Sequence, residues 1–287
     1  MGPPRMGEER VVLVHGFTQT ARSWDAVAGI LAGRFEVVAV DLPGHGLSAG
    51  ERRTFEDTAA VIGATGGPAT YVGYSMGARL CLRLALDRPE VVDRLVLLGG
   101  SPGLASATER AGRKAADDRL ADRLGQIGTG AFLDEWLSQP MFDALTPAAD
   151  DLASRRANPP AGLAYALRVL GTGAQEPLWD RLGELDMPVL VVAGGLDAKF
   201  ATLGRRMADA IGDNATFESV PGCGHAAHLE DPERFSGTVE RFVHAASRAN
   251  SARSGTGRRT ASTPPTGSSG STTTSAARSD AVPRPQA

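Results

Sequence analysis

A Gly-x-Ser-x-Gly pentapeptide, GYSMG at residues 73–77, stands between an apolar segment and an amphipathic one. The apolar residues from Ala69 predict a strand, and the residues after Ser75 predict a helix that Pro89 ends. A strand that turns sharply into a helix crowds the backbone, and Gly73 and Gly77 remove the Cβ atoms that would clash. The helix N-terminus then offers backbone N–H groups to negative charge beside Ser75. The pentapeptide therefore predicts a nucleophile elbow with Ser75 as the catalytic serine.

Short apolar runs alternate with helical stretches over most of the chain. This alternation is typical of α/β proteins, in which helices flank a mostly parallel sheet. The expected strands are Val11–Val14, Val37–Val40, Ala69–Gly73, Leu95–Leu98, Pro188–Ala193 and Thr216–Val220. The expected helices are Ala21–Leu31, one from near Phe55, one after Ser75, Phe200–Ile211 and Pro232–Ala246.

Two segments depart from this alternation. Between about residues 103 and 173 the pattern is helical and rich in Arg and Asp, which predicts a helical cap inserted over the site. From residue 248 to 287 the chain is mostly Ser, Thr, Ala, Pro, Gly and Arg, which predicts a disordered low-complexity tail. We therefore expect one α/β domain at residues 1–247, including the cap, followed by the tail at 248–287.

An acid and a base for Ser75 follow two later strands. Asp197 lies in GGLDAKF after the strand that ends at Ala193, and His225 lies in PGCGHAAH after Val220. The order Ser, Asp, His, each just past the carboxyl end of a strand, matches the arrangement of an α/β-hydrolase triad. The backbone N–H groups of Phe17, in HGF after the first strand, and of Met76 are the expected oxyanion hole.

Other residues could take these roles. His228 is an alternative base, but it lies beyond the Gly-rich loop that gives His225 freedom to reach Ser75. Structural or solvent-facing roles are expected for His45 and His244, and His15 is expected to order its own loop. Asp93 and Asp186 precede strands, at the wrong edge of the sheet for the triad acid.

Composition excludes several classes of protein. The last 40 residues hold six Arg and one Asp, so the net charge of −3 conceals a body at −8, which excludes a general nucleic-acid binder. Cys81 and Cys223 suit neither a disulfide framework nor a metal site, and two free thiols are expected. Because no signal peptide and no run of about 18 apolar residues is seen, we expect a soluble, cytoplasmic protein that does not contact membranes.

Several motifs carry a family resemblance across residues 10–246. HGFTQTARSW, DLPGHGLS, GYSMGARL, GGLDAKF and PGCGHAAHLEDPE resemble the α/β-hydrolase superfamily. More narrowly, GSPGL, FLDEWLSQPMF, RANPPAGLAYAL, GTGAQEPLW and DAKF resemble the 2-succinyl-6-hydroxy-2,4-cyclohexadiene-1-carboxylate synthases of menaquinone biosynthesis. That resemblance implies an α/β-hydrolase fold with a helical cap and a lyase that needs no cofactor or metal.

The implied reaction eliminates pyruvate from 2-succinyl-5-enolpyruvyl-6-hydroxy-3-cyclohexene-1-carboxylate. Ser75, activated by His225 and Asp197, would abstract a ring proton as a base. The alternative is a serine hydrolase of carboxylic esters or carbon–carbon bonds, with Ser75 as nucleophile. A non-catalytic binding module fits an intact triad poorly. The sequence does not determine the oligomeric state, and both a monomer and a homo-oligomer are compatible with it.

The resemblance also implies residues that bind a small polycarboxylate substrate. They are Tyr74, Arg79, Arg113, Trp136 and Arg156. Independently, Arg pairs bidentately with carboxylates, and Arg79 lies one helical turn after Ser75 on the same face. Arg110 competes with Arg113, and Arg155 with Arg156, so the positions of the cap arginines stay open. Ala78 also replaces a second glycine common in the serine motif.

Overall fold

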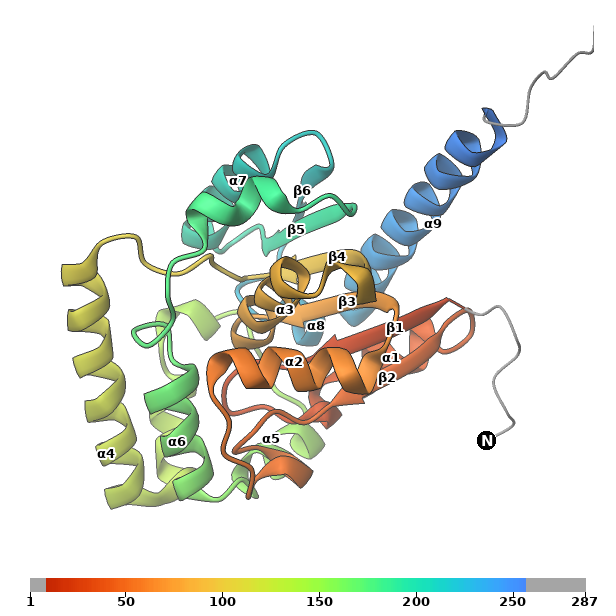
Figure 1. Cartoon of the computed structure of the whole chain (residues 1–287). Coiled ribbons are helices and arrows are strands. Elements are labelled where there is room, and N and C mark those ends of the chain that lie inside the picture. The colour runs from red at the N-terminus through yellow and green to blue at the C-terminus, as the bar shows by residue number, and fades with distance from the viewer. Residues whose placement is uncertain (1–8, 257–287) are drawn as a thin grey trace, which may run out of the picture. The chain divides into compact units, whose positions relative to one another are not determined.

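Six parallel strands form a single sheet in the computed structural model, which describes residues 9–256 (Figure 1). The strand order is β2-β1-β3-β4-β5-β6, and every neighbouring pair is parallel. The strands are β1 Arg10–Val14, β2 Glu36–Val40, β3 Ala69–Tyr74, β4 Val92–Leu98, β5 Val189–Gly194 and β6 Ala215–Val220. Each matches a predicted strand, with the largest change at β4, which begins at Val92 rather than Leu95.

Apolar side chains alternate between the two faces of the sheet, as a strand period of two requires. On one face they pack against α2 (Phe55–Gly66), α3 (Met76–Asp87) and α7 (Ala198–Ile211). On the other face they pack against α1 (Asp25–Leu31), α8 (Ala227–Glu230) and α9 (Pro232–Thr256). Both faces of the parallel sheet are therefore covered, and its strands are almost entirely apolar for that reason.

Five short 3₁₀ helices connect these elements within the described residues. They are η1 Ala21–Trp24, η2 Gly46–Ser48, η3 Pro89–Val91, η4 Pro140–Phe142 and η5 Trp179–Glu184. The helix expected at Ala21–Leu31 is divided into η1 and α1. Thr20 caps η1 by accepting a hydrogen bond from the Arg22 backbone N–H.

The insertion expected at about residues 103–173 consists of α4 (Ala107–Leu137), α5 (Ala149–Arg156) and α6 (Pro160–Leu170). Figure 1 shows α4 and α6 side by side, and a small apolar core that includes Leu124, Phe132 and Leu163 lies between them. The backbone of α4 is kinked at Gly128, where φ is 75°. Phe17 and Trp136 pack on this second core, so the cap contacts the loop that follows β1.

The last helix is longer than expected. We predicted that it would end at Ala246, but α9 continues to Thr256. The disordered tail expected from residue 248 stays a prediction. The rest of the predicted tail, residues 257–287, lies outside the described residues.

The carboxyl ends of the strands meet at one edge of the sheet. Val14 is paired with Gly73, Tyr74 with Leu98, and Gly194 with Val220. The loops after β1, β3, β4, β5 and β6 therefore meet at this edge, where ligands bind in open parallel sheets.

Candidate active site

Ser75 occupies a strained turn between β3 and α3. Its φ is 49°, a value that a residue with a side chain rarely adopts. A Cβ at Gly73 would lie 2.6 Å from the Ala78 backbone, and one at Gly77 would overlap the carbonyl oxygen of Val14. The two glycines thus have the steric role expected of them, and the turn holds Ser75 at the N-terminus of α3.

Asp197 and His225 lie together on the loops after β5 and β6. Oδ2 of Asp197 is 2.7 Å from Nδ1 of the buried His225 ring. Burial alone would raise the pKa of the Asp197 carboxyl, but the hydrogen bonds from His225 and the Phe200 backbone N–H outweigh it and lower the pKa. Because an ionised Asp197 accepts a hydrogen bond from Nδ1–H of His225, the proton stays on Nδ1 and Nε2 keeps a lone pair.

The ring of His225 is held in a narrow space at the end of β4. Gly99 has a φ of 58°, and a Cβ there would lie 2.8 Å from Cε1 of His225. Phe200 packs on the ring with 4.5 Å between centroids. Nε2 is buried and has no hydrogen-bond partner among residues 9–256. It is therefore free to act on Ser75 or on a bound molecule, since such hydrogen bonds often form only on ligand binding.

The other candidate bases are placed differently. The buried His228 is hydrogen-bonded at Nε2 to Gln19, 3.3 Å away, and burial lowers its pKa well below the ordinary value. Burial also lowers the pKa of His45 to about 3, and His45 lies next to the Pro43 carbonyl. His244 is exposed on α9, as are Asp93 on β4 and Asp186 before β5. Of these groups only Asp197 and His225 are paired as a triad requires.

The loop His15–Thr20, which we call the oxyanion loop, fixes the backbone of Phe17. The Gly16 carbonyl accepts hydrogen bonds from Nδ1 of His15 at 2.8 Å and from the Gln19 backbone N–H at 3.2 Å. His15 is the donor because its Nε2 accepts from the Leu42 N–H, so His15 orders its own loop. A trans peptide directs its N–H opposite to its carbonyl. The Phe17 N–H thus points away from these contacts and has no partner among the described residues.

One small cavity of about 70 Å³ brings several of the predicted residues together. Its lining includes Ser75 and Met76 at the start of α3, Phe17 from the loop after β1, and residues of α4 and α6 from the cap. Its lining also includes Arg79, Arg113, Asp117, Trp136, Ala166, Leu167, Gly171 and Thr172. Trp136 serves in addition as part of the cap core, since its ring lies 5.1 Å from that of Phe17.

Arg79 is a buried cation in this cavity without a carboxylate in ion-pairing distance among the described residues. Its Nη1 donates to Oε1 of Gln175 at 2.9 Å, and its Nη2 donates to the Leu170 carbonyl at 2.7 Å. Burial, together with the nearby charge of Arg113, lowers the pKa of Arg79 to about 10, so it stays protonated at neutral pH. A buried cation held only by neutral groups attracts an anion.

Arg113 is the second cation of the cavity. Its Nε lies 2.7 Å from Oδ1 of the buried Asp117, one turn along α4. Arg110, the alternative to Arg113, instead donates to the carbonyls of Leu104 and Ala105. Arg110 therefore stabilises the segment that leads into the cap. The cavity that Ser75 lines is therefore lined by Arg113 and not by Arg110.

Two of the residues expected to bind substrate lie outside the cavity lining. Arg156 is exposed and paired with Asp134, because the phase of α5 turns it to the surface. Tyr74 is buried beneath the site, with its ring 5.3 Å from that of His225. Arg155, the alternative to Arg156, is buried, but it faces Asp151 and Thr18 rather than the cavity. Neither Tyr74 nor Arg156 lines this cavity, and their expected role in substrate binding stays a prediction.

Some residues of the site were missed in the sequence. Gly99 in LLGGSPG could have been noticed as a glycine after a strand, but only the fold brings it against His225. Gln175 lies in the motif GTGAQEPLW, for which the sequence predicted no individual role. In the structure Gln175 orients Arg79. Thr18 and Asn158 belong to the motifs HGFTQTARSW and RANPPAGLAYAL, but nothing local indicates that they are in contact, because the hydrogen bond between them joins residues that are 140 positions apart.

Neither a membrane-spanning helix nor a cluster of metal ligands occurs in the described residues. No helix in residues 9–256 combines the length and apolar character needed to cross a membrane. Over the same range, no three His, Cys, Asp or Glu side chains are grouped to hold a metal ion. Cys81 and Cys223 are both free and buried.

Comparison with known proteins identifies the family of this chain. The model of the alpha/beta hydrolase family matches residues 11–238. A 2-succinyl-6-hydroxy-2,4-cyclohexadiene-1-carboxylate synthase of Serratia proteamaculans (strain 568) is 32% identical over 242 residues, covering 81% of this chain and 92% of that protein. A Bacillus subtilis (strain 168) protein whose name gives the same activity provisionally is 34% identical over 249 residues, covering 82% of this chain and 90% of its own length.

A solved structure is also similar to this chain. MenH from S. aureus superposes with a TM-score of 0.78 at 28% sequence identity, covering 83% of this chain and 94% of that one. The α/β-hydrolase fold expected from the sequence is thereby confirmed, as is the narrower resemblance. The chain belongs to the α/β-hydrolase family, in which it is similar to the 2-succinyl-6-hydroxy-2,4-cyclohexadiene-1-carboxylate synthases.

Proposed function

We propose that this protein is a lyase that eliminates pyruvate from 2-succinyl-5-enolpyruvyl-6-hydroxy-3-cyclohexene-1-carboxylate. The product is 2-succinyl-6-hydroxy-2,4-cyclohexadiene-1-carboxylate, and the reaction would be a step of menaquinone biosynthesis. The relatives named above carry this activity in their names. The catalytic groups would be Ser75, His225 and Asp197, with the backbone N–H groups of Phe17 and Met76 as the oxyanion hole.

The observation that carries the proposal is the environment of Arg79. This guanidinium is buried one helical turn from Ser75, and its direct partners are the neutral Gln175 and the Leu170 carbonyl. A substrate carboxylate would supply the missing negative charge through a charge-assisted hydrogen bond. The proposed substrate has three carboxylates, whereas a simple ester has none. A buried Arg79 without a carboxylate partner in the described residues therefore favours a polycarboxylate substrate over a simple ester.

The chemistry follows from comparing substrate and product. A base removes the proton from ring carbon 2, which is acidic because it is next to the succinyl ketone. The ring double bond shifts from carbons 3 and 4 to carbons 4 and 5 as a new double bond forms between carbons 2 and 3. The bond from carbon 5 to oxygen breaks, and enolpyruvate leaves with the electron pair, is protonated and tautomerises to pyruvate. No acyl-enzyme is needed.

Each proposed catalytic group has a place in this sequence. Nε2 of His225 accepts the hydroxyl proton of Ser75, and Oγ of Ser75 takes the proton from carbon 2. Asp197 keeps the ring of His225 oriented and stabilises its charged form. The backbone N–H groups of Phe17 and Met76 would stabilise the ketone oxygen as it becomes an enolate. His225 can then return its proton to the leaving enolpyruvate.

The cavity is smaller than the proposed substrate. A volume of about 70 Å³ holds few atoms, whereas sites for ligands of this size measure roughly 300 to 1,000 Å³. Substrate entry therefore requires cap side chains to move. Arg113 and Trp136 are partly exposed, so they can move more easily than the buried Arg79.

A coupled assay for pyruvate tests the proposal. The purified protein is supplied with 2-succinyl-5-enolpyruvyl-6-hydroxy-3-cyclohexene-1-carboxylate, and pyruvate is measured with lactate dehydrogenase. We expect one pyruvate per substrate consumed. Arg79→Gln should raise KM by about tenfold or more, since a charged hydrogen bond is worth roughly 1.5–3 kcal/mol.

The competing function is ester or carbon–carbon bond hydrolysis by the same triad. It is tested with 4-nitrophenyl acetate and butyrate in the same preparation, with intact-mass measurement during turnover. An acyl adduct on Ser75 without pyruvate release from the cyclohexene substrate would favour the hydrolase.

A further inference from the structure

Thr18, in the middle of the oxyanion loop, has an unfavourable backbone conformation. Its φ is 69°, and apart from Ser75 it is the non-glycine residue with a positive φ in the described part of the chain. Gly16 to Gln19 form a turn closed by the Gln19 N–H on the Gly16 carbonyl, and Thr18 occupies the third position. That position usually takes Gly or Asn, and a β-branched residue is disfavoured there. Other contacts must therefore hold the turn in this form.

Those contacts come from the cap. Nδ2 of Asn158, in the short link between α5 and α6, donates to the Thr18 carbonyl at 2.9 Å. Nη2 of Arg155, at the end of α5, donates to Oγ1 of Thr18 at 2.6 Å. Asn158, Arg155 and Thr18 are all buried. The strained residue is thus held at its backbone and at its side chain by two cap residues.

Further contacts fix these two residues. Oδ1 of Asn158 accepts from the Gly46 N–H at 2.8 Å, and its backbone carbonyl accepts from Oγ1 of Thr129 at 2.7 Å. Since a backbone N–H can only donate, the Gly46 contact also fixes the orientation of the Asn158 amide. Arg155 is neutralised by Asp151, which accepts in turn from Oγ of Ser23.

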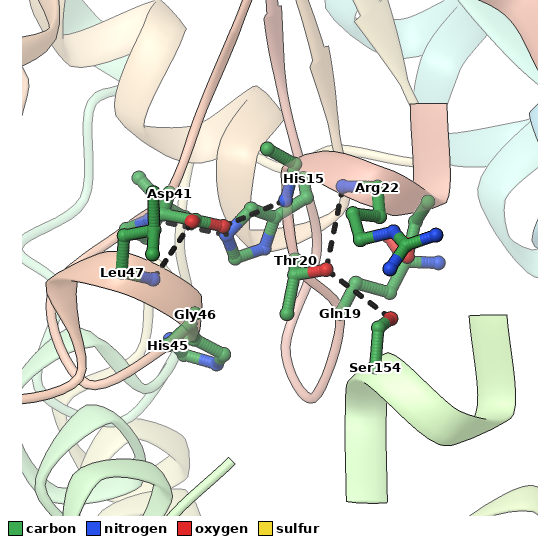
Figure 2. Close-up of polar contacts among 12 residues, drawn as sticks. His15, Gln19, Thr20, Arg22, Asp41, His45, Gly46, Leu47 and Ser154 are labelled. Carbon is green, nitrogen blue, oxygen red and sulfur yellow. Dashed lines mark hydrogen bonds and ion pairs between the residues drawn. The ribbon is translucent and has the colours of Figure 1, made fainter. Parts of the chain in front are cut away.

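Figure 2 shows a neighbouring link between the same two segments. Thr20, at the end of the oxyanion loop, donates from Oγ1 to Oγ of Ser154 on α5 at 3.2 Å. The carboxylate of Asp41 accepts from the backbone N–H of Ala21, the residue after the loop. The same carboxylate accepts from the Leu47 N–H, as Figure 2 shows. The end of the loop is therefore held both by Asp41 and by α5.

From these contacts we infer that Asn158, supported by Arg155, is a positioning residue of the oxyanion hole. It acts through Thr18 to hold the peptide that presents the Phe17 N–H to the developing enolate. The inference rests on the proposed function, in which Phe17 supplies one of two oxyanion donors. It makes the cap a part of the catalytic apparatus and not only a cover for the substrate.

Asn158→Asp is the sharpest test, because it keeps the size of the side chain and the acceptor for Gly46. It replaces the donor to Thr18 with an oxygen that faces the Thr18 carbonyl. We expect kcat for pyruvate release to fall about 10- to 100-fold with KM within about twofold, since loss of one oxyanion donor costs roughly 10²–10³. Adding Thr18→Gly should restore about tenfold in kcat, because Gly adopts a positive φ without strain.

A second readout does not depend on the natural substrate. Diethyl 4-nitrophenyl phosphate phosphorylates an activated serine: the bond from Oγ to phosphorus forms, and 4-nitrophenolate leaves. Its phosphoryl oxygen uses the oxyanion hole, so Asn158→Asp should slow labelling of Ser75 by a similar factor, with the same rescue by Thr18→Gly. If the wild type releases no pyruvate but is labelled, the proposed function fails and the positioning role is still tested.

The matched control is Asp150→Asn, which changes an exposed carboxylate on the same helix and should leave both rates unchanged. Asn158→Ala is the second variant if Asn158→Asp does not fold, with the same expected loss and rescue. Unchanged kcat and labelling in a folded variant would overturn the inference. A rise in KM alone, or a loss that Thr18→Gly does not reduce, would overturn it as well.

Discussion

Nδ1 of His225 lies 2.7 Å from Oδ2 of Asp197, and Nε2 on the opposite side of the same ring has no partner among the described residues. One nitrogen of the ring is thus paired with the carboxylate, and the other is left without a hydrogen bond from residues 9–256. Because the Asp197 carboxyl has a lowered pKa, it stays ionised at neutral pH and keeps the ring in one tautomer.

Replacing the carboxylate by an amide should remove this control. We expect Asp197→Asn to lower kcat for pyruvate release by about 10³- to 10⁴-fold, because the ring can then adopt the wrong tautomer. Asp186→Asn, at an exposed position before β5, is the control and should keep wild-type kcat. Steady-state kinetics of the two variants decide the point, and an Asp197→Asn enzyme within tenfold of wild type would contradict the assigned role.

Gly99 should be required for the position of His225. In Gly99→Ala the new Cβ would lie 2.8 Å from Cε1 of the ring, and φ is 58°. We expect a loss of about 1–2 kcal/mol in stability from the backbone conformation and a loss of most activity from the displaced ring. Gly212→Ala is the matched control, because φ there is 110° but no atom lies within 4 Å of the added Cβ. If both variants lose stability and activity alike, the contact with His225 is not responsible.

The positions of the three candidate triad residues could be predicted because their signals are local, whereas their catalytic roles stay predictions. Ser75, Asp197 and His225 each follow an apolar strand within a Gly-containing loop, and the order of strands in a parallel sheet brings such loops to one edge. The sequence also located the cap, since the alternation of strands and helices stops there. Strand ends shifted by a few residues because pairing with a neighbour, not local composition, decides where β4 begins.

The cap arginines were less predictable. Arg155 and Arg156 are adjacent, so a rotation of about 100° around α5 decides which is buried, and only packing fixes that rotation. Arg155 is buried against Thr18, while Arg156 pairs with Asp134 at the surface. Contacts across more than a hundred residues leave no periodic signal, and Asn158 was overlooked for the same reason.

The two arginines of α4 and α5 now have different expected effects. Arg113→Ala should raise KM for the cyclohexene substrate about tenfold, as expected for losing about 1.4 kcal/mol of binding. Arg156→Ala should change KM and kcat by less than about twofold, since exposed ion pairs contribute little and the residue lies outside the cavity. The measurement is steady-state kinetics of both variants. If Arg156→Ala raises KM and Arg113→Ala keeps the KM of the wild type, then Arg156 and not Arg113 binds the substrate.

Buried neutral histidines should make the fold sensitive to mild acid. Burial lowers the pKa of His15 to about 4 and that of His45 to about 3. The unfolded chain therefore binds protons at higher pH than the folded one, so stability is lost as pH falls from about 6.5 towards 4. The slope is at most about 1.4 kcal/mol per pH unit for each histidine.

Urea unfolding of His45→Gln between pH 7.5 and 4.5 checks this expectation. The variant should show a smaller loss of stability with acid than the wild type, while His244→Gln, changed at an exposed position, should match the wild type. Equal slopes in the wild type and His45→Gln would mean that His45 does not titrate on unfolding.

The central claim is that Ser75 acts as the base of a lyase, and the most direct measurement is pyruvate release by Ser75→Ala. Wild type and variant are compared with 2-succinyl-5-enolpyruvyl-6-hydroxy-3-cyclohexene-1-carboxylate at pH 7.5, after circular dichroism shows that both are folded. We predict one pyruvate per substrate for the wild type and a kcat at least about 10³-fold lower for Ser75→Ala. Near-normal pyruvate release by a folded Ser75→Ala variant would contradict the account.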